Sequence, residues 1–229
     1  MTKKLLFGIF AHPDDEAFGP AGTLLLESHA GTEIHLITLT SGSAGANPDG
    51  APDLGGTRLE EWHTAGRLMN VSGMHSLGFT DGALNNIVMR GASQQIENII
   101  RNELKAHAEP VEIELMSFDA NGLTGHIDHI VASRAAHYVF YKLKREGLPL
   151  ARLRLYCLPR SAAPEPNIDW IYADQGHGPE EIDETVDVTP VLNEVREIVH
   201  AHHSQRADGA LRLTALDAGM TADHFIVKT

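Results

Sequence analysis

The sequence predicts an α/β fold, a Rossmann-like and mostly parallel sheet with helices on both faces. Short apolar runs such as residues 5–10 lack the polar alternation of a half-exposed strand, so they suit strands that are covered on both faces. Segments with helical start and stop signals separate these runs, which is the βαβ pattern of a parallel sheet. In such sheets ligands bind beyond the carboxyl ends of the strands.

The first βαβ unit is the clearest. The apolar run 5–10 predicts a strand, and Pro13 with the acids that follow it predicts the start of a helix. This helix should continue to about residue 30, where Gly31 would cap it, and residues 33–40 read as the next strand. The stretch 41–56 is rich in Gly, Pro, Asn and Asp, so we expect a loop that lines an active site.

The remaining elements alternate in the same way. In chain order we expect a helix from Thr57 or a neighbour to about 71, a strand near 75–77, a turn at 80–82, a helix over about 92–107, a strand over 112–118, a helix from the 126 segment to about 145, a strand over 152–158 and a helix from Thr189 to about 203.

Length and composition limit the classes of protein. A chain of 229 residues with 42% hydrophobic residues can bury one sizeable core, so we expect a single domain over residues 1–229. The net charge of −13, with acids scattered throughout and no basic patch, argues against a nucleic-acid partner. Cys157 is the only cysteine, which excludes an intramolecular disulfide and a thiolate metal cluster.

The N-terminus imitates a signal peptide, because basic residues precede an apolar run. However, His12 and three acids interrupt this run, and no small-residue cleavage pattern follows. No later segment is long and apolar enough to cross a bilayer. We therefore expect a soluble, cytoplasmic protein without a membrane partner.

Chemistry-bearing residues gather in Ala11–Glu16, directly after the first predicted strand. His12 and Asp15 are three residues apart, and a turn that enters a helix can direct both side chains toward one point. Imidazole and carboxylate are zinc ligands. Taken alone, the acids could equally well cap a helix.

A second segment changes that balance. After the loop 121–125, His126 and His129 repeat the three-residue offset behind another predicted strand. A single pair of this kind is more often an exposed helix face than a ligand pair. Together with His12 and Asp15, the segment predicts a zinc site with three protein ligands and an open position for water.

Other functions find less support. A nucleotide-binding Rossmann domain would use Gly19 and Gly22, but no Gly-x-Gly-x-x-Gly turn is present and acids at the helix entrance would repel a pyrophosphate. The histidines of 200–203 are explained by their place near a helix C-terminus. Cys157 lies in an apolar strand, where a buried, inert thiol is expected.

With both motifs in place, the chain resembles the LmbE-like zinc deacetylases, also called the PIG-L family of N-acetylglucosaminyl deacetylases. The resemblance includes Arg58 with Glu61, Gly78–Gly82 and the late His203–Gln205. It implies that His12, Asp15 and His129 bind one Zn²⁺ per chain, with other divalent metals such as Fe²⁺ as alternatives. The substrate it implies is a small N-acetylated glucosamine conjugate.

The resemblance also assigns catalytic roles. Asp14 would be the general base, and His126 in its charged form would stabilise the developing oxyanion. Asp128 would orient His126 and keep it protonated, which requires the segment to be partly loop because residues two apart on a helix diverge. A metal-binding protein of this fold that acts on a non-sugar amide, or that serves as a non-catalytic binding module, is the alternative.

Substrate binding is predicted less sharply. Arg58 and Asp81 match family residues that hold sugar hydroxyls, but an Arg58–Glu61 pair within a helix and an ordinary turn at Asp81 explain them as well. Position 124 is Thr where some relatives have tyrosine, and the stretches 41–56 and 159–181 resemble no particular subfamily. Family members often form trimers or hexamers, so we expect a homo-oligomer.

Overall fold

A computed structural model describes residues 2–163 and 176–229. The strands are β1 (Lys3–Phe10), β2 (Glu33–Thr40), β3 (Gly73–Phe79), β4 (Val111–Phe118), β5 (Leu150–Cys157), β6 (Glu184–Asp187) and β7 (Ala222–Lys228). The helices are α1 (Asp15–Phe18), α2 (Ala21–His29), α3 (Leu54–Leu68), α4 (Asn86–Lys105), α5 (Gly122–Gly125), α6 (Ile127–Arg145), α7 (Leu192–Ala201) and α8 (Arg206–Asp217).

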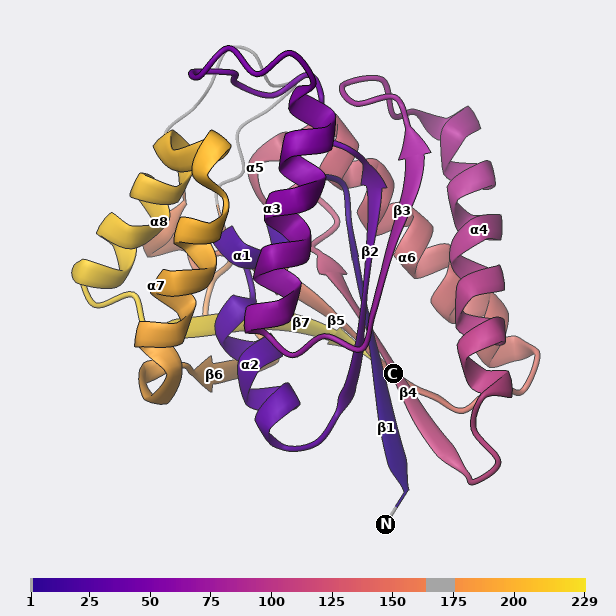
Figure 1. Cartoon of the computed structure of the whole chain (residues 1–229). Helices are drawn as coiled ribbons and strands as arrows, with labels where there is room; N and C mark the ends of the chain where they lie inside the picture. Colours follow the sequence, from indigo (N-terminus) through magenta and orange to yellow (C-terminus); the bar gives the residue numbers. More distant parts are fainter. Residues whose placement is uncertain (1, 164–175) are drawn as a thin grey trace.

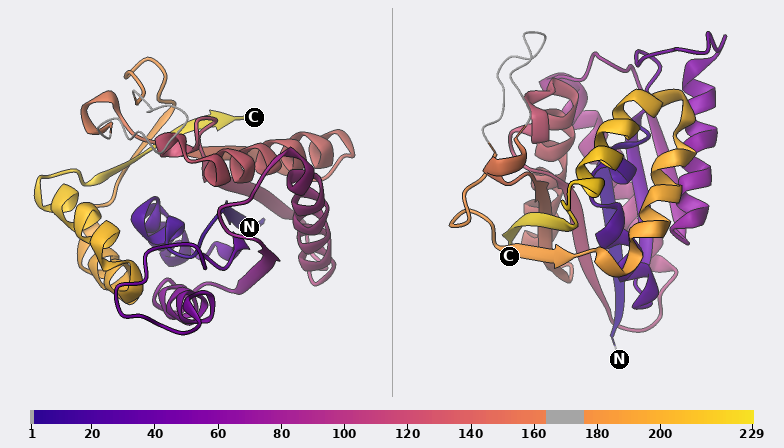
Figure 2. Two further views of the ribbon diagram at one scale, coloured as in Figure 1. Left: turned by 90° about the horizontal axis from the view of Figure 1, so that it is seen from above. Right: turned by 90° about the vertical axis from the view of Figure 1, so that its left-hand side faces the viewer.

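The strands form one sheet in the order β3-β2-β1-β4-β5-β7-β6 (Figure 1). Neighbours from β3 to β5 are parallel, whereas β7 runs antiparallel to both β5 and β6. Helices α4 and α6 cover one face, and α1, α2, α3, α7 and α8 cover the other (Figure 2). This arrangement confirms the predicted α/β fold class.

Burial on both faces explains the apolar strands. Successive side chains of β1 alternate between two core clusters, with Phe7 and Ile9 in the cluster under α4 and α6. Leu6 and Phe10 belong to the cluster under α2, α3 and α7. From Leu5 to Phe10 this strand has no solvent-facing position, which is why these residues show no polar alternation.

The strand order reverses at β1, and this reversal places the candidate site. From β1 the chain passes outward to β2 and β3, while β4 pairs with the opposite side of β1. The loops that follow β1 and β4 therefore diverge at the carboxyl edge of the sheet and leave a crevice between them. These two loops contain the two predicted metal-binding segments.

Several element boundaries differ from the prediction. The helix expected over 13–30 is divided into α1 and α2 at Gly19-Pro20, because proline disfavours a helical residue before it and has no N–H to donate. Helix α3 begins before Thr57, since the Asp53 side chain accepts from the Gly56 N–H. Helix α4 begins before residue 92, because Asn85 accepts from the backbone of its first turn.

The antiparallel end of the sheet and helix α8 were not predicted. The short strand β6 shows only partial burial, and the alternation of β7 is interrupted by Asp223, a buried acid that accepts from Thr23. Part of the stretch 159–181 lies outside the described residues. No helix in the described ranges is long and apolar enough to cross a membrane.

Candidate active site

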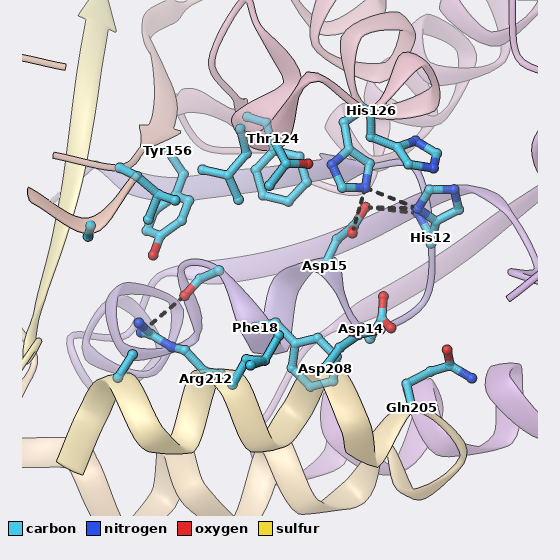
Figure 3. A pocket seen from close by; sticks show the side chains of 18 of the residues that line it. His12, Asp14, Asp15, Phe18, Thr124, His126, Tyr156, Gln205, Asp208 and Arg212 are labelled. Carbon is cyan, nitrogen blue, oxygen red and sulfur yellow. Dashed lines mark hydrogen bonds and ion pairs between the residues drawn. The ribbon is translucent and has the colours of Figure 1, made fainter. Parts of the chain in front are cut away.

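Residues from both predicted segments line one cavity of about 860 Å³ at the carboxyl edge of the sheet (Figure 3). His12 and Asp15 approach from the turn between β1 and α1, whereas His126 and His129 come from the start of α6. The sequence prediction that these distant segments converge is therefore confirmed by their positions.

Three of the side chains present donor atoms to a common point. His12 Nδ1 lies 3.2 Å from His129 Nε2, and Asp15 Oδ1 lies 3.2 Å from the same His129 nitrogen. Asp15 Oδ2 lies 3.7 Å from His12 Nδ1. Ligands of a tetrahedral zinc ion stand about 3.3–3.5 Å apart, so this spacing suits one ion.

Hydrogen bonds on the outer side of each ring fix which nitrogen faces inward. His12 Nε2 lies 3.0 Å from Asp81 Oδ1, and His129 Nδ1 lies 3.1 Å from the Gly122 carbonyl oxygen. Because these oxygens accept, His12 Nδ1 and His129 Nε2 carry the lone pairs. Metal-binding histidines are commonly held this way. Two lone pairs 3.2 Å apart would repel each other, so the donor set fits a shared cation.

The electrostatics of the site also favour positive charge between these groups. Burial lowers the pKa of His12, but hydrogen bonds to Asp128, Asp15 and Asp81 outweigh it and raise the pKa well above its usual range. Burial would raise the pKa of Asp15, yet His129 and His12 hold it well below its usual range. A carboxylate and a nearby cation are thus the stable combination.

His126 is a further neighbour of this centre. Its ring centroid lies 5.1 Å from that of His12 and 4.8 Å from that of His129, and the three histidines offer donor atoms within 4.8 Å of one another. The Asp128 backbone N–H donates to His126 Nδ1, so the proton of the neutral ring is on Nε2. Burial, followed by the charges of His129 and His12, lowers the pKa of His126 to about 4. In the protein without a metal ion this value corresponds to a neutral ring near neutral pH, whereas the family resemblance implies the charged form.

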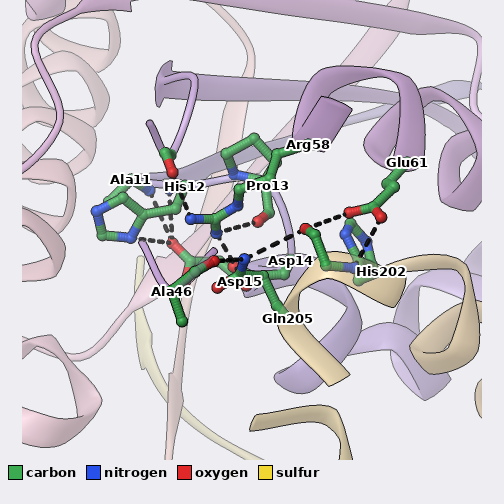
Figure 4. Close-up of polar contacts among 12 residues, drawn as sticks. Ala11, His12, Pro13, Asp14, Asp15, Ala46, Arg58, Glu61, His202 and Gln205 are labelled. Carbon is green, nitrogen blue, oxygen red and sulfur yellow. Dashed lines mark hydrogen bonds and ion pairs between the residues drawn. The ribbon is translucent and has the colours of Figure 1, made fainter. Parts of the chain in front are cut away.

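Asp14 is held in an unusual backbone conformation beside the metal ligand Asp15 predicted above. Its φ of 114° lies in the region that L-residues rarely adopt, and the residue is buried. Arg58 Nη2 donates to Asp14 Oδ2 at 2.9 Å (Figure 4). Burial raises the pKa of Asp14 to about 7, although the Arg58 charge opposes this shift. A carboxyl group with this pKa can exchange a proton near neutral pH.

A buried ion pair supports this strained turn from behind. Glu16 accepts from the Asp14 backbone N–H and from His202 Nε2, the latter at 3.0 Å with both side chains fully buried. His202 ends α7, so the pair joins chain segments 186 residues apart. The 200–203 histidines were expected only to lie near a helix terminus. The contact with Glu16 was not predictable, because nothing in the sequence pairs residues 186 positions apart.

Arg58 lines the cavity, as a substrate-binding residue would, but its hydrogen bonds are to the protein itself. Its guanidinium is buried and donates to the carbonyl oxygens of Gly42 and Pro13, both at 2.7 Å, as well as to Asp14. Glu61, the alternative partner within the helix, instead accepts from the backbone and hydroxyl of Ser204. The two Nη atoms of Arg58 thus hold the Asp14 turn, whereas its Nε has no hydrogen-bond partner among the described residues. Its contact with a sugar hydroxyl stays a prediction.

Asp81 and Asp128 both lie against His12, a contact that the sequence did not predict. Asp81 also lines the cavity, and its role in substrate binding stays a prediction. Asp81 lies against His12 and accepts from the Ala44 N–H at 2.6 Å; burial raises its pKa, but the contact with His12 dominates and lowers it to about 2. The Asp128 carboxylate accepts from the Gly82 and Leu84 N–H groups and lies 3.4 Å from His12 Nε2. The expected contact between the Asp128 carboxylate and His126 is therefore wrong. The Asp128 backbone N–H donates to His126, while the carboxylate binds the 81–84 turn.

The outer part of the cavity has mixed walls. Phe18, Tyr156 and Leu158 give an apolar surface, and the exposed Leu211 and Met220 extend it outward. Polar groups on the same wall are Gln205, Asp208, Arg212 and His224, and Thr124 lies close to the histidines. Part of this wall, namely Asp208, Leu211 and Arg212 of α8 and His224 of β7, comes from elements that the sequence did not predict.

Comparisons with known proteins agree with this arrangement. Residues 7–140, more than half of the chain, match the PIG-L family, which is described as GlcNAc-PI de-N-acetylase. A relative from Salinispora arenicola named 1D-myo-inositol 2-acetamido-2-deoxy-alpha-D-glucopyranoside deacetylase is 29% identical over 179 residues, 70% of this chain and 58% of the relative. The protein of the same name from Mycobacterium tuberculosis is 30% identical over 56% of this chain and 48% of its own length. The chain therefore spans about half the length of these relatives.

Solved structures share the fold at low sequence identity. An N,N'-diacetylchitobiose deacetylase from Pyrococcus horikoshii superposes with a TM-score of 0.69 at 19% identity, over 99% of this chain and 84% of its own. A 4-carboxy-2-hydroxymuconate hydratase from Pseudomonas putida gives 0.67 at 14% identity, over 100% and 97%. These likenesses show a common fold, and the family match defines the relationship: the chain belongs to the PIG-L family.

Proposed function

We propose that this protein is a zinc-dependent N-deacetylase that removes an acetyl group from the amide nitrogen of a small N-acetylglucosamine-type conjugate. The observation that carries the proposal is the convergence of His12 Nδ1, Asp15 and His129 Nε2 beside Asp14, a buried acid whose pKa is raised to about 7. The names of the relatives, which are deacetylases of a glucosamine conjugate, support the same reaction.

His12, Asp15 and His129 would hold the metal, with Zn²⁺ favoured by two imidazoles and a carboxylate and Fe²⁺ as an alternative. A divalent ion bound there supplies Lewis acidity and makes water acidic enough to lose a proton near neutral pH.

The protein's own groups account for the proton transfers. Asp14 takes a proton from the attacking water, and the new C–O bond gives a tetrahedral oxyanion. His126 donates from its neutral Nε2–H to that oxygen, which needs no positive charge on the ring. Asp14 then returns its proton to the nitrogen as the C–N bond breaks, so acetate and a free amine leave.

The cavity walls are compatible with a conjugate of modest size. The polar groups Gln205, Asp208 and Arg212 suit sugar hydroxyls, while Phe18 and Tyr156 offer apolar surface to a ring or an aglycone. These features do not distinguish a sugar from another amide, so a non-sugar N-acyl substrate is the second candidate. The exposed Leu211 and Met220 at the wall favour it, because they add apolar surface away from the histidines.

The test separates metal binding from turnover. Zinc-loaded protein should release free amine from N-acetylglucosamine conjugates, and a panel of non-sugar acetamides defines the substrate class. His129→Ala should lose the zinc of the cavity site together with activity, whereas Asp14→Asn should retain that zinc and lose activity. Zinc binding without amine release from any member of the panel would instead favour a non-catalytic binding module.

His126→Ala is the matched control for the ligand assignment. If His126 acts on the oxyanion, this variant keeps its zinc and loses turnover. Loss of zinc in His126→Ala with retention in Asp15→Ala would replace the proposed ligand set with the three histidines.

A further inference from the structure

A second cluster of metal-ligating side chains lies away from the cavity, between the edge of the sheet and α4. His35 on β2, His75 on β3 and Glu103 on α4 each offer one donor atom, and these atoms lie within 4.8 Å of one another. His35 is the third residue of β2, whereas the active-site cavity lies beyond the opposite, carboxyl end of that strand. In Figure 1 these three elements lie side by side.

The hydrogen bonding of His35 directs a lone pair into this cluster. Its side chain is only 3% exposed, and Nε2 lies 3.2 Å from Glu33 Oε1. Glu33 therefore accepts the ring proton, and His35 Nδ1 is left as an acceptor. That nitrogen is buried and has no hydrogen-bond partner among the described residues. A carboxylate on the outer nitrogen is the usual support of a metal-binding histidine.

The charges around Glu33 keep it in place. Lys3 Nζ lies 3.2 Å from Glu33 Oε2, and His107 Nε2 lies 3.2 Å from Oε1. The acid is thus a stable acceptor for His35.

His75 supplies the second inward nitrogen. Its Nε2 is also buried without a hydrogen-bond partner in the described part of the chain, and it lies 3.7 Å from Glu103 Oε1. The rings of His75 and His35 stack with centroids 6.0 Å apart and planes 19° apart. Leaving a polar atom buried and unpaired costs about 1–3 kcal/mol, so two such nitrogens side by side indicate an occupant.

Gly73 keeps the space between these nitrogens open. A Cβ atom at this position would lie 2.4 Å from His35 Nδ1 and 3.1 Å from His75 Nε2. Both nitrogens therefore border the same point, and any larger residue would fill it. Gly73 also pairs with His35 in the sheet register, so the gap is built into the β2–β3 pairing.

We propose that His35, His75 and Glu103 bind a second divalent metal ion, for which Zn²⁺ is the best match. Two imidazole nitrogens and one carboxylate form a donor set typical of zinc. Glu103 is 30% exposed and can adjust its position, and the same exposure admits water as a further ligand. The ion would tie α4 to the two outermost parallel strands and stabilise that edge.

The test counts the zinc bound per chain, so the protein carries no polyhistidine tag. His129→Ala is the background, because it leaves the cavity site without one of its proposed ligands. We expect one zinc per chain in His129→Ala and none in His129→Ala/His75→Gln, by metal analysis after dialysis and by calorimetric titration with ZnCl₂. Glu103→Gln, at a partly exposed position, should weaken this binding at least about tenfold without disturbing the core.

His29→Gln is the matched control, because His29 is an exposed histidine on α2 that pairs with Glu194. The control double variant, His129→Ala/His29→Gln, should still bind one zinc per chain. No zinc in His129→Ala, or one zinc that survives both His75→Gln and Glu103→Gln, would overturn the proposal. Deacetylase activity plays no part in this count, so its outcome is independent of the proposed reaction.

Discussion

At the scale of single residues, Asp14 shows how the fold creates a reactive group. The family resemblance implies that it is a general base, but its pKa of about 7 depends on burial, which no local pattern reveals. Its positive φ is held by Glu16 and His202, whose contact spans the chain. Strain and burial of this kind are typical of functional positions.

Asp14→Asn should therefore separate stability from activity. Turnover should fall by about 10²–10⁴-fold, because the amide cannot accept the proton. In metal-free protein the pKa of Asp14 is about 7 when folded, against a reference value of 3.8. The folded state binds more protons between these values, so rising pH lowers the wild-type free energy of unfolding.

The asparagine variant lacks this titration. Relative to wild type, its free energy of unfolding should increase from about pH 4.5 to about pH 7.5, by up to about 4 kcal/mol. Urea unfolding of both proteins at the two pH values measures the difference. If the two proteins differed in free energy of unfolding by the same amount at both pH values, Asp14 would have its ordinary pKa in the folded state.

Asp81→Asn tests whether Asp81 orients His12 or binds substrate. The asparagine can present its amide NH₂ to His12 Nε2 and so loosen the tautomer, which should weaken zinc affinity about 10–100-fold. Competition with a chelator gives the affinity, and KM at saturating zinc gives substrate binding. An unchanged zinc affinity with a raised KM would restore the sugar-binding role predicted from sequence.

At the scale of elements, the alternation of strands and helices was predictable and the element ends were not. β2 was predicted at its observed bounds, since its apolar run is flanked by Gly31 and by a polar loop. The 13–30 helix was wrong because Pro20 outweighs the surrounding helical pattern. β7 was missed because the buried Asp223 interrupts it, and its partner Thr23 lies 200 residues away.

Gly22 gives a test of helix packing. A Cβ at this position in α2 would lie 2.4 Å from Val188 Cγ1, so Gly22→Ala should lower the free energy of unfolding by about 1–3 kcal/mol despite the helix preference of alanine. Gly91→Ala in α4 is the control, because its Cβ meets Phe79 at an ordinary 3.6 Å. Denaturant unfolding should show the control unchanged or stabilised by up to about 1 kcal/mol.

At the scale of the whole molecule, topology explains why two motifs more than a hundred residues apart could be combined from sequence alone. Both follow strands, and parallel strands in this fold end at a common edge. Residues 12–15 and 126–129 were therefore predictable as a pair. The outer wall of the cavity was not, because it depends on the antiparallel strands and α8. A single domain, a cytoplasmic location and a trimeric or hexameric assembly stay predictions.

Metal removal should affect the stability of the whole fold. A ligand that binds only the native state at about 100 times its dissociation constant adds about 2.7 kcal/mol. For a chain of this size, chelation should then lower Tm by about 5–10 °C. Calorimetry with and without EDTA measures the shift, and His129→Ala should show a smaller one. Equal shifts in both proteins would mean that the cavity histidines contribute nothing to metal binding.

The division of the cavity between the two halves of the chain has an evolutionary consequence. The residues proposed to bind the metal and to transfer protons lie within residues 7–140, the part that the family match covers, whereas Tyr156, Arg212 and Met220 follow it. Substitutions at these later cavity positions should therefore alter which molecules fit without changing the proposed metal ligands, provided that His202, which supports the Asp14 turn through Glu16, is kept. Related proteins with this division can therefore change their range of substrates while they keep the same reaction.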